Sequence, residues 1–357
     1  MRLLEQLVNT HGIPGREHRV RDLIESHVRK AGLFDEIRVD ALGSLICLRR
    51  ARPRDGSSAA AARVLVMAHM DQIGFLVSHV SQDGLIYLHP VGSFDPRTLI
   101  ARRVLVYAQA GKALPGALLA PGHPVHTAEP DDLRKVPDLK TLYVDLSLSA
   151  ETVRAKVRPG DMVVLDAPYG EIGHAIVGGG LDNRAGCWAL ISAIEMLTSH
   201  DCEICAVWTA QEELGSRGAG PVAFGYEADI GISCDTIVSC DVPGVPGEQR
   251  IARPGDGVSI VIADSSIVSD MSLVAAVEAV ANAQNIRCQR SLMLGGGQDG
   301  ALIQRSRRGV RTLVLSCPLK HMHTAVETAH RADLESYRDL LAAYLGRTSS
   351  LQSAGAD

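Results

Sequence analysis

The sequence predicts an α/β protein in which a mixed sheet with helices on both faces is interrupted by a small inserted all-β domain. From about residue 175 onward, helical and strand-like segments alternate, which is typical of a sheet packed by helices. Between about residues 74 and 165, short alternating segments are separated by glycine and proline turns. The chain of 357 residues is long enough for about two domains. We therefore expect one domain over 1–73 and 166–346, an insertion over 74–165 and a flexible tail over 347–357.

The first part of the chain contains signals for a helix, a hairpin and a strand. Apolar residues recur at helical spacing within residues 16–31, at Val20, Leu23, Ile24 and Val28. The segment "IRVDALGSLICLRR" alternates like a hairpin, and "ARPRDGSSAAAA" has the polar and small residues of a surface loop. The apolar run "RVLVMAHMD" then predicts a buried strand. In the insertion, the expected strands are "GFLVSHV", "GLIYLHP", "RRVLVYAQA" and "DMVVLDA".

The second half of the chain carries the alternation that predicts the sheet. Helices are expected at "NRAGCWALISAIEML", "SLVAAVEAVANAQ" and "LESYRDLLAAYL". Strands are expected at "CEICAVWTA", "DIGISCD" and "VRTLVLSC". These segments continue the fold that the first strand begins, with the insertion between them.

Charge and composition exclude several classes of protein. The net charge is −5 with no basic block, so there is no electrostatic footprint for nucleic acid. The N-terminus lacks the apolar core of a signal peptide, and the most apolar later stretch is short and contains Glu278, so no membrane span is expected. The eight cysteines are interpreted as reduced core residues, including Cys202 and Cys205 of "CEIC". We expect a cytoplasmic protein.

Distinctive polar residues follow the predicted strands, at the edge where ligands bind in open α/β sheets. Asp182 adds to them, between the glycine loop "VGGG" and the next helix. Taken alone, Asp182 could be an N-cap and two adjacent glutamates could be a solvated loop. The joint occurrence of the set favours a functional site. Its strand-end members are His69 and Asp71 after "VLVMA", Glu212 and Glu213 after "AVWTAQ", Asp235 after "IGISC", and His323 after "TLVLSCPLKHM".

Histidines mixed with carboxylates suit zinc, cobalt or manganese better than magnesium or calcium. The set contains more ligands than one tetrahedral site needs. If one carboxylate bridges, the residues can serve two ions about 3.5–4 Å apart, which leaves another carboxylate free to act as a base. Neither a complete dinucleotide-binding glycine motif nor a G-x-S-x-G element is present, so the sequence does not favour a dinucleotide enzyme or a serine hydrolase.

Six ordered motifs resemble a known family. The segments "AHMDQIGF", "LDNRAG", "QEELGSRGA", "DIGISCD" followed by "DVPG", "GGQDG" and "KHMHTAVE" are similar in order and spacing to those of the glutamyl-aminopeptidase-like metallopeptidases that form tetrahedral (TET) assemblies. The resemblance extends over essentially the whole chain, including "VGSFDPR" in the insertion. It implies that the insertion mediates oligomerisation and that the remainder is a catalytic domain.

The resemblance also implies a role for each site residue. His69, Asp182 and Asp235 would hold one divalent ion, while Asp182, Glu213 and His323 would hold the other. Glu212 would be the general base and Asp71 would orient His69. The implied reaction is release of N-terminal residues from short peptides, with two ions of zinc, cobalt or manganese as cofactors. The implied assembly is a homododecamer built from dimers.

The chain departs from the family pattern mainly around the expected substrate pocket. Gln72 and Asn183 replace two usual acidic residues, and Gln298 stands where threonine is common. In the motif "KHMHTAVE", the usual arginine, tyrosine and proline are replaced by Lys320, His321 and Ala325. His321 can either line the pocket or be a surface histidine.

These changes bear on the substrate more than on hydrolysis, so two alternatives stay open. One is an amidohydrolase acting on a small non-peptide amide or amine. The other is an inactive cage-forming protein, although retention of Glu212 argues against it.

Overall fold

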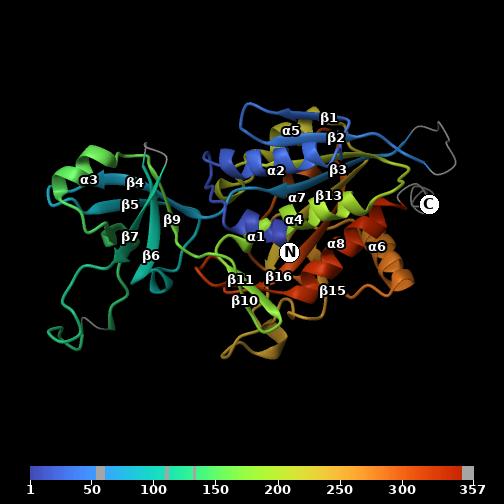
Figure 1. The fold of residues 1–357 in the computed structure, drawn as a ribbon. Coiled ribbons are helices and arrows are strands. Elements are labelled where there is room, and N and C mark those ends of the chain that lie inside the picture. Colours follow the sequence, from blue (N-terminus) through green and yellow to red (C-terminus); the bar gives the residue numbers. More distant parts are fainter. Residues whose placement is uncertain (54–60, 109–111, 132–133, 348–357) are drawn as a thin grey trace.

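The protein consists of a large sheet covered by helices and a separate small barrel, as a computed structural model shows (Figure 1). The structure describes residues 1–53, 61–108, 112–131 and 134–347. The expected mixed α/β fold with an added all-β unit is confirmed. Most of the expected loop 51–62 and nearly all of the expected tail 347–357 lie outside the described residues.

The large sheet has four parallel strands at its centre, β12, β3, β13 and β16. Because they are parallel, their carboxyl ends meet at one edge of the sheet. The hairpin expected near the N-terminus is present as antiparallel β1 and β2. In order across the sheet, the strands are β1 (Glu36–Val39), β2 (Leu45–Arg49), β12 (Glu203–Thr209), β3 (Arg63–His69), β13 (Ile230–Val238), β16 (Arg311–Lys320), β17 (Glu327–His330), β11 (Ala175–Gly178) and β10 (Gly170–Ile172), with β14 (Val258–Ala263) and β15 (Cys288–Leu292) branching from β16.

Helices pack on both faces of this sheet. One face carries α1 (Arg2–Val8), α2 (His18–Lys30), α4 (Leu181–Met196), α6 (Met271–Gln284) and α8 (Arg331–Leu345), whose apolar residues form the main core with the strands. The other face carries α5 (Ala219–Gly225) and α7 (Gly300–Gln304), which pack in a second cluster. Cys202 belongs to the first cluster and Cys205 to the second, and all eight cysteines are free thiols.

The barrel closes in the strand order β4-β5-β8-β7-β6-β9 and has its own apolar core. Helix α3 (Ala150–Lys156) packs at the end far from the large sheet (Figure 1). A long connection between β7 and β8 projects from the barrel in the same view. The barrel strands are β4 (Gly74–Val80), β5 (Ile86–Val91), β6 (Arg102–Tyr107), β7 (Ala113–Leu119), β8 (Tyr143–Asp145) and β9 (Met162–Leu165).

Short 3₁₀ turns complete the architecture: η1 (Pro96–Thr98), η3 (Leu139–Thr141), η4 (Glu212–Leu214) and η5 (Gly247–Gln249). Among the helices that the structure describes, none is long and apolar enough to span a bilayer. Two of these turns are close to the expected functional residues. Turn η4 carries the adjacent glutamates, and η1 follows the segment that leaves barrel strand β5 toward the large sheet.

Candidate metal centre

The sequence-predicted site residues come together at the carboxyl edge of the central parallel strands. His69 is the last residue of β3, Asp235 lies near the end of β13, and Glu213 lies in η4 just beyond β12. Asp182 enters from the first turn of α4, and His323 follows β16. Their ligand atoms form two overlapping groups, His69 with Asp182 and Asp235, and Asp182 with Glu213 and His323.

All three residues of the first group are buried. The Nε2 atom of His69 lies 3.3 Å from Oδ1 of Asp182 and 3.5 Å from Oδ1 of Asp235. Ligands that bind one zinc ion tetrahedrally at about 2.0–2.1 Å are separated from one another by roughly 3.3–3.4 Å. The spacing of these side chains therefore fits a shared cation.

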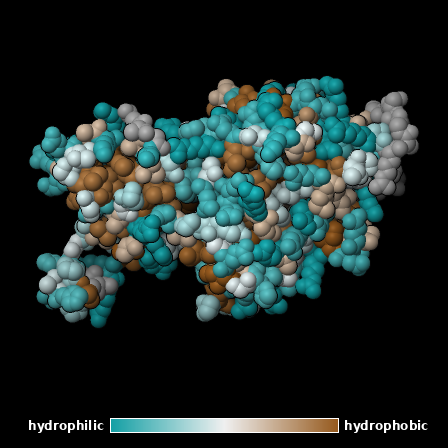
Figure 2. All heavy atoms as spheres, viewed as in Figure 1, coloured by the Kyte–Doolittle hydropathy of each residue, from teal (hydrophilic) through white to brown (hydrophobic). Residues whose placement is uncertain are grey.

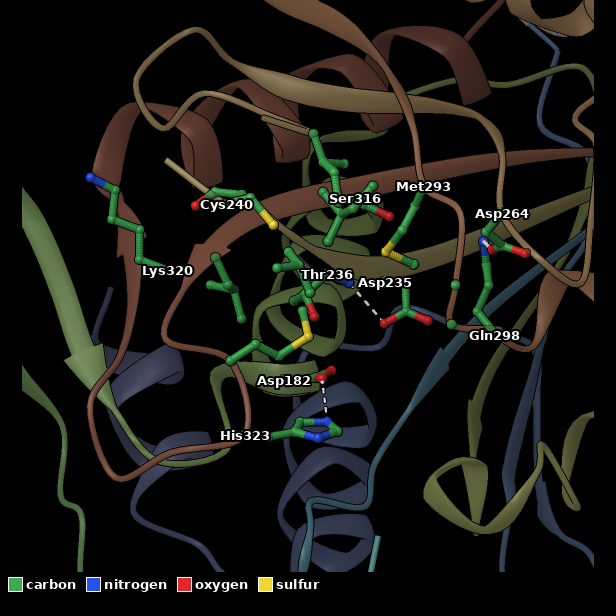
Figure 3. Close-up of a pocket in the computed structure, with 18 of the residues that line it drawn as sticks. Asp182, Asp235, Thr236, Cys240, Asp264, Met293, Gln298, Ser316, Lys320 and His323 are labelled. Atoms are coloured by element: carbon green, nitrogen blue, oxygen red, sulfur yellow. Dashed lines mark hydrogen bonds and ion pairs between the residues drawn. The ribbon is translucent and has the colours of Figure 1, made fainter. Parts of the chain in front are cut away.

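The second group has the same spacing and shares Asp182. Nε2 of His323 lies 3.3 Å from Oδ2 of Asp182 and 3.3 Å from Oε1 of Glu213. Asp182 thus turns one carboxylate oxygen to each histidine, which is the arrangement a bridging ligand needs. Figure 3 shows Asp182 between His323 and Asp235 on the pocket wall.

Both histidines are oriented by carbonyl oxygens behind them. Nδ1 of His69 lies 3.1 Å from the backbone oxygen of Asp71, and Nδ1 of His323 lies 3.0 Å from that of Ser93. With a proton on Nδ1, each histidine donates to the carbonyl behind it. Its Nε2 then faces the carboxylates, as is usual for metal-binding histidines. Ser93 belongs to the segment between β5 and β6, so the barrel side of the chain contributes to the site.

The N-cap role considered for Asp182 is filled by its neighbour. Asp182 and Asn183 have non-helical backbone angles, and their peptide bond is cis. The Oδ1 atom of Asn183 accepts from the backbone N–H of Gly186 at 2.9 Å, and its Nδ2 donates to the oxygen of Cys234. This capping by Asn183 leaves the carboxylate of Asp182 free for the site.

The adjacent glutamates lie in a turn and not at the end of a strand. Strand β12 stops at Thr209, Gln211 takes a left-handed conformation with φ of 60°, and η4 begins at Glu212. The carboxylate of Asp71 accepts from the backbone N–H of Glu212 at 3.0 Å and of Glu213 at 2.9 Å. Asp71 also has Oδ1 3.5 Å from Nδ1 of His69. It therefore lies against His69 and also fixes both glutamates.

Charges in the centre are shared between buried carboxylates and histidines. Burial alone would lower the pKa of His323, but the adjacent carboxylates of Asp182 and Glu213 outweigh it and raise the pKa to about 11. The same balance raises the pKa of His69 well above its usual value. Burial raises the pKa of Glu212, with further contributions from nearby carboxylates. A divalent ion bound between these groups would balance the charge of the buried carboxylates.

Two further carboxylates hold the site segments in place and were missed by sequence reasoning. The buried Glu327 accepts from the backbone N–H of Asp182 at 3.0 Å and of His323 at 2.8 Å. Glu17 accepts from the N–H of Gln211 at 3.0 Å, next to the glutamate turn. Glu327 closes the motif "KHMHTAVE", so its place in that motif was a usable signal. Glu17 lies at the start of α2, and no sequence signal marked it as part of the site.

The departures from the family pattern occupy different places. His321 is exposed and lines the pocket, so both descriptions considered for it apply. It does not share an extended segment with His323, because both residues have positive φ in a turn. Gln72 is buried and accepts from Arg184 at 3.2 Å, behind the site. Gln298 lines the pocket and donates to Asp264 at 3.3 Å.

The chain is similar to known peptidases over nearly its whole length. The M42 glutamyl aminopeptidase family model matches residues 51–340. A lysyl aminopeptidase from Pyrococcus furiosus is 29% identical over 348 residues, covering 96% of each chain. An aminopeptidase structure from the archaeon Desulfurococcus kamchatkensis has a TM-score of 0.91 at 29% identity, covering 100% of this chain and 97% of that one. The Pyrococcus horikoshii TET1 peptidase, which can assemble into a tetrahedron or a large octahedral shell, has a TM-score of 0.83 at 30% identity, covering 97% and 99%.

Proposed function

This chain belongs to the M42 glutamyl aminopeptidase family and is an aminopeptidase, and we propose that it releases N-terminal residues from short peptides with two divalent metal ions. The observation that carries the proposal is the pair of overlapping ligand groups that share Asp182. The nitrogen–oxygen separations of 3.3–3.5 Å within them suit tetrahedral coordination. Oδ1 of Asp182 and Oε1 of Glu213 are also buried without a hydrogen-bond partner, as expected of atoms that await a cation.

The proposed ligands follow from this geometry. His69, Asp182 and Asp235 would hold one ion, and Asp182, Glu213 and His323 the other. Imidazole nitrogens with carboxylate oxygens suit zinc, cobalt or manganese. When bound, two such ions would polarise the scissile carbonyl and lower the pKa of a water molecule between them.

Glu212 is the proposed general base. Its carboxylate lines the pocket beside the ligand groups but belongs to neither of them. The hydroxyl of Ser216 donates to its Oε1 at 3.1 Å, and Asp71 fixes its backbone. We assign Glu212 to take the proton of the attacking water and to deliver it to the leaving amine. Asp71 is a positioning residue that holds His69 and the glutamate turn together.

A homododecamer built from dimers is the proposed assembly, with residues 74–165 as the oligomerisation unit. The similarity to the TET1 peptidase supports this. Figure 2 shows hydrophobic residues gathered on the visible face of the barrel, which would be covered in an assembly. Light scattering should give about twelve times the chain mass of 38.1 kDa. A monomeric mass with full peptidase activity would contradict this part of the proposal.

The function is tested with purified protein supplied with cobalt, zinc or manganese. Aminoacyl-p-nitroanilides and short peptides should be hydrolysed, and removal of metal by a chelator should abolish turnover. Hydrolysis only of small amides that lack a free α-amine would instead support the amidohydrolase alternative. No turnover of any substrate with any of the metals would contradict an active enzyme.

The base assignment has its own test. Glu212→Gln should bind metal as the wild type does and lose about 100- to 10,000-fold in kcat, the usual contribution of a general base. Ser216→Ala removes only the neighbouring hydroxyl donor and should keep most of the activity. Full activity of Glu212→Gln with metal bound would contradict the assignment.

A further inference from the structure

The candidate metal centre lies at one end of a pocket of about 940 Å³, and the other end is apolar. Figure 3 shows Asp182 and His323 at one end, with Met293 and Cys240 lying farther away on the other side of Asp235 and Thr236. The apolar end is formed by residues of β13, β14, β16 and two connecting segments. Its side chains include those of Ile237, Ile251, Val261 and Met293.

The apolar wall is part of a packed cluster. Ile237 and Val261 are each only 2% exposed and lie on β13 and β14, where they pack with Val314 of β16. Ile251 and Met293 are partly buried and pack against the same cluster. Because the wall is backed by strands of the sheet, it presents a preformed apolar surface beside the proposed ions.

The charged side chains near this end already have partners. Nζ of Lys320 lies 3.6 Å from Asp241, and Arg250 pairs with the same carboxylate at 2.9 Å. Asp264 accepts from the backbone N–H of Ser266 at 2.6 Å and of Ile267 at 3.0 Å, and from the amide of Gln298.

Asp95 and Arg97, which also line the pocket, form a close ion pair with each other. Apart from the metal centre, the pocket-lining residues Lys320, Asp95 and Arg97 are therefore in ion pairs, and Asp264 is held by hydrogen bonds from neutral donors. A charged substrate side chain placed here would lose its hydration and would have to compete with these existing partners. An aliphatic side chain would move from water onto an apolar surface. This transfer strengthens the binding constant by about fourfold for each buried methylene.

We infer that the apolar end receives the side chain of the peptide's N-terminal residue and selects aliphatic and thioether side chains, such as those of leucine and methionine, over charged ones. This inference rests on the proposed aminopeptidase function, because the metal centre fixes which residue of the peptide lies beside the wall. The wall residues then determine specificity, and Met293, which is partly buried on the loop that follows β15, is chosen for a test.

The first test is a panel of leucyl-, methionyl-, alanyl-, glutamyl- and lysyl-p-nitroanilides, with kcat/KM measured on the full-length metal-loaded protein. Leucyl and methionyl substrates should exceed the alanyl substrate by roughly 10- to 100-fold, since each adds several buried carbon or sulfur atoms. They should exceed the glutamyl and lysyl substrates by at least about 100-fold. A glutamyl or lysyl preference would overturn the inference while leaving the aminopeptidase function intact.

A pair of neighbouring variants tests whether the wall is responsible. Met293→Lys places a cation in the pocket, so the leucyl-to-glutamyl ratio of kcat/KM should fall by at least about 10-fold. Leu294→Lys is the control, because Leu294 is fully exposed, at 103%, and should leave the ratio unchanged. A ratio measured on one preparation does not depend on the fraction of active enzyme. An unchanged ratio in Met293→Lys would overturn the assignment of the wall.

A binding measurement separates failure of the inference from failure of the proposed function. If no substrate is hydrolysed, the proposed function fails, and calorimetry with L-leucine, L-glutamate and L-lysine still tests the pocket. Binding of leucine at least about 10-fold tighter than that of the charged amino acids supports the inference. Equal affinities, or tighter lysine binding that Asp264→Asn removes, would overturn it.

Discussion

The two halves of the candidate metal centre have the same spacing but are built on different backbones. His69 and Asp235 belong to neighbouring parallel strands, and their side chains are 3% and 10% exposed. Glu213 and His323 belong to two turns, and the side chain of His323 is 27% exposed. A sheet edge thus fixes the buried half, whereas the half nearer solvent depends on hydrogen bonds that the oxygens of Asp71, Glu327 and Ser93 accept. The two halves therefore have the same ligand spacing but differ in the rigidity of the backbone that holds the ligands.

The change with the largest expected effect removes the residue common to both halves. Asp182→Ala should lose both ions and reduce kcat/KM by more than about 1,000-fold, because the electrostatic contribution of bound metal is several kcal/mol. Metal content per chain, measured by elemental analysis, should fall from about two toward zero. Asp83→Asn, at an exposed position of the barrel, serves as the control and should retain both ions. Two tightly bound ions in Asp182→Ala would rule out a bridging role.

Metal release should distinguish the two halves directly. A chelator should remove the ions in two phases, with the ion of the more exposed half leaving first. His323→Ala should abolish the fast phase and leave one slowly released ion, with activity reduced by more than about 100-fold, since even residues behind a ligand contribute 10- to 100-fold. His69→Ala should abolish the slow phase. A single phase in the wild type would contradict the difference in rigidity.

Asp71 should couple the two halves. Asp71→Asn keeps the shape but turns an amide toward one of the backbone N–H groups of Glu212 and Glu213. We expect about a 10- to 100-fold loss of activity, the usual cost of removing a group behind a metal ligand. The measurement is kcat together with metal affinity, and both should change. A loss of kcat with unchanged metal affinity would show that Asp71 supports Glu212 alone.

Glu327 should have the smallest effect, on the half built from turns. Glu327→Gln can keep only one of the two bonds to the N–H groups of Asp182 and His323, and the lost buried bond costs about 1–3 kcal/mol. Chemical unfolding of the metal-free protein should show this loss, together with weaker binding of the second ion. Glu335→Gln, at an exposed position of α8, should change the unfolding free energy by less than about 0.5 kcal/mol. Equal effects of the two variants would contradict the role of Glu327.

The sequence predicted the strand-built half of the centre better than the turn-built half. Apolar strands followed by His69 and Asp235 are read from pattern alone, because parallel strands must bring their ends to one edge. The same pattern placed Glu212 and Glu213 at a strand end, but the left-handed Gln211 starts a turn there. Nor does strand periodicity reveal that the backbone turns at both His321 and His323.

What could not be predicted depends on contacts between distant segments. Glu17 is 194 residues from Gln211, and Ser93 is 230 residues from His323, so no local spacing relates them. The expected α/β class and the added all-β unit follow from periodicity and were confirmed. The hydrogen bonds that orient ligands depend on how loops fold over the sheet edge, and one sequence does not encode these in a periodic signal.

The carbonyl of Ser93 that orients His323 limits how the protein can be engineered. This residue, like the pair Asp95 and Arg97 on the pocket rim, lies in the chain between the barrel strands β5 and β6. A shortened chain that joined Ile73 directly to Asp166 would therefore delete part of the site along with the barrel. The barrel cannot be treated as a detachable module, and any miniaturised version of this protein would have to retain the segment around Ser93.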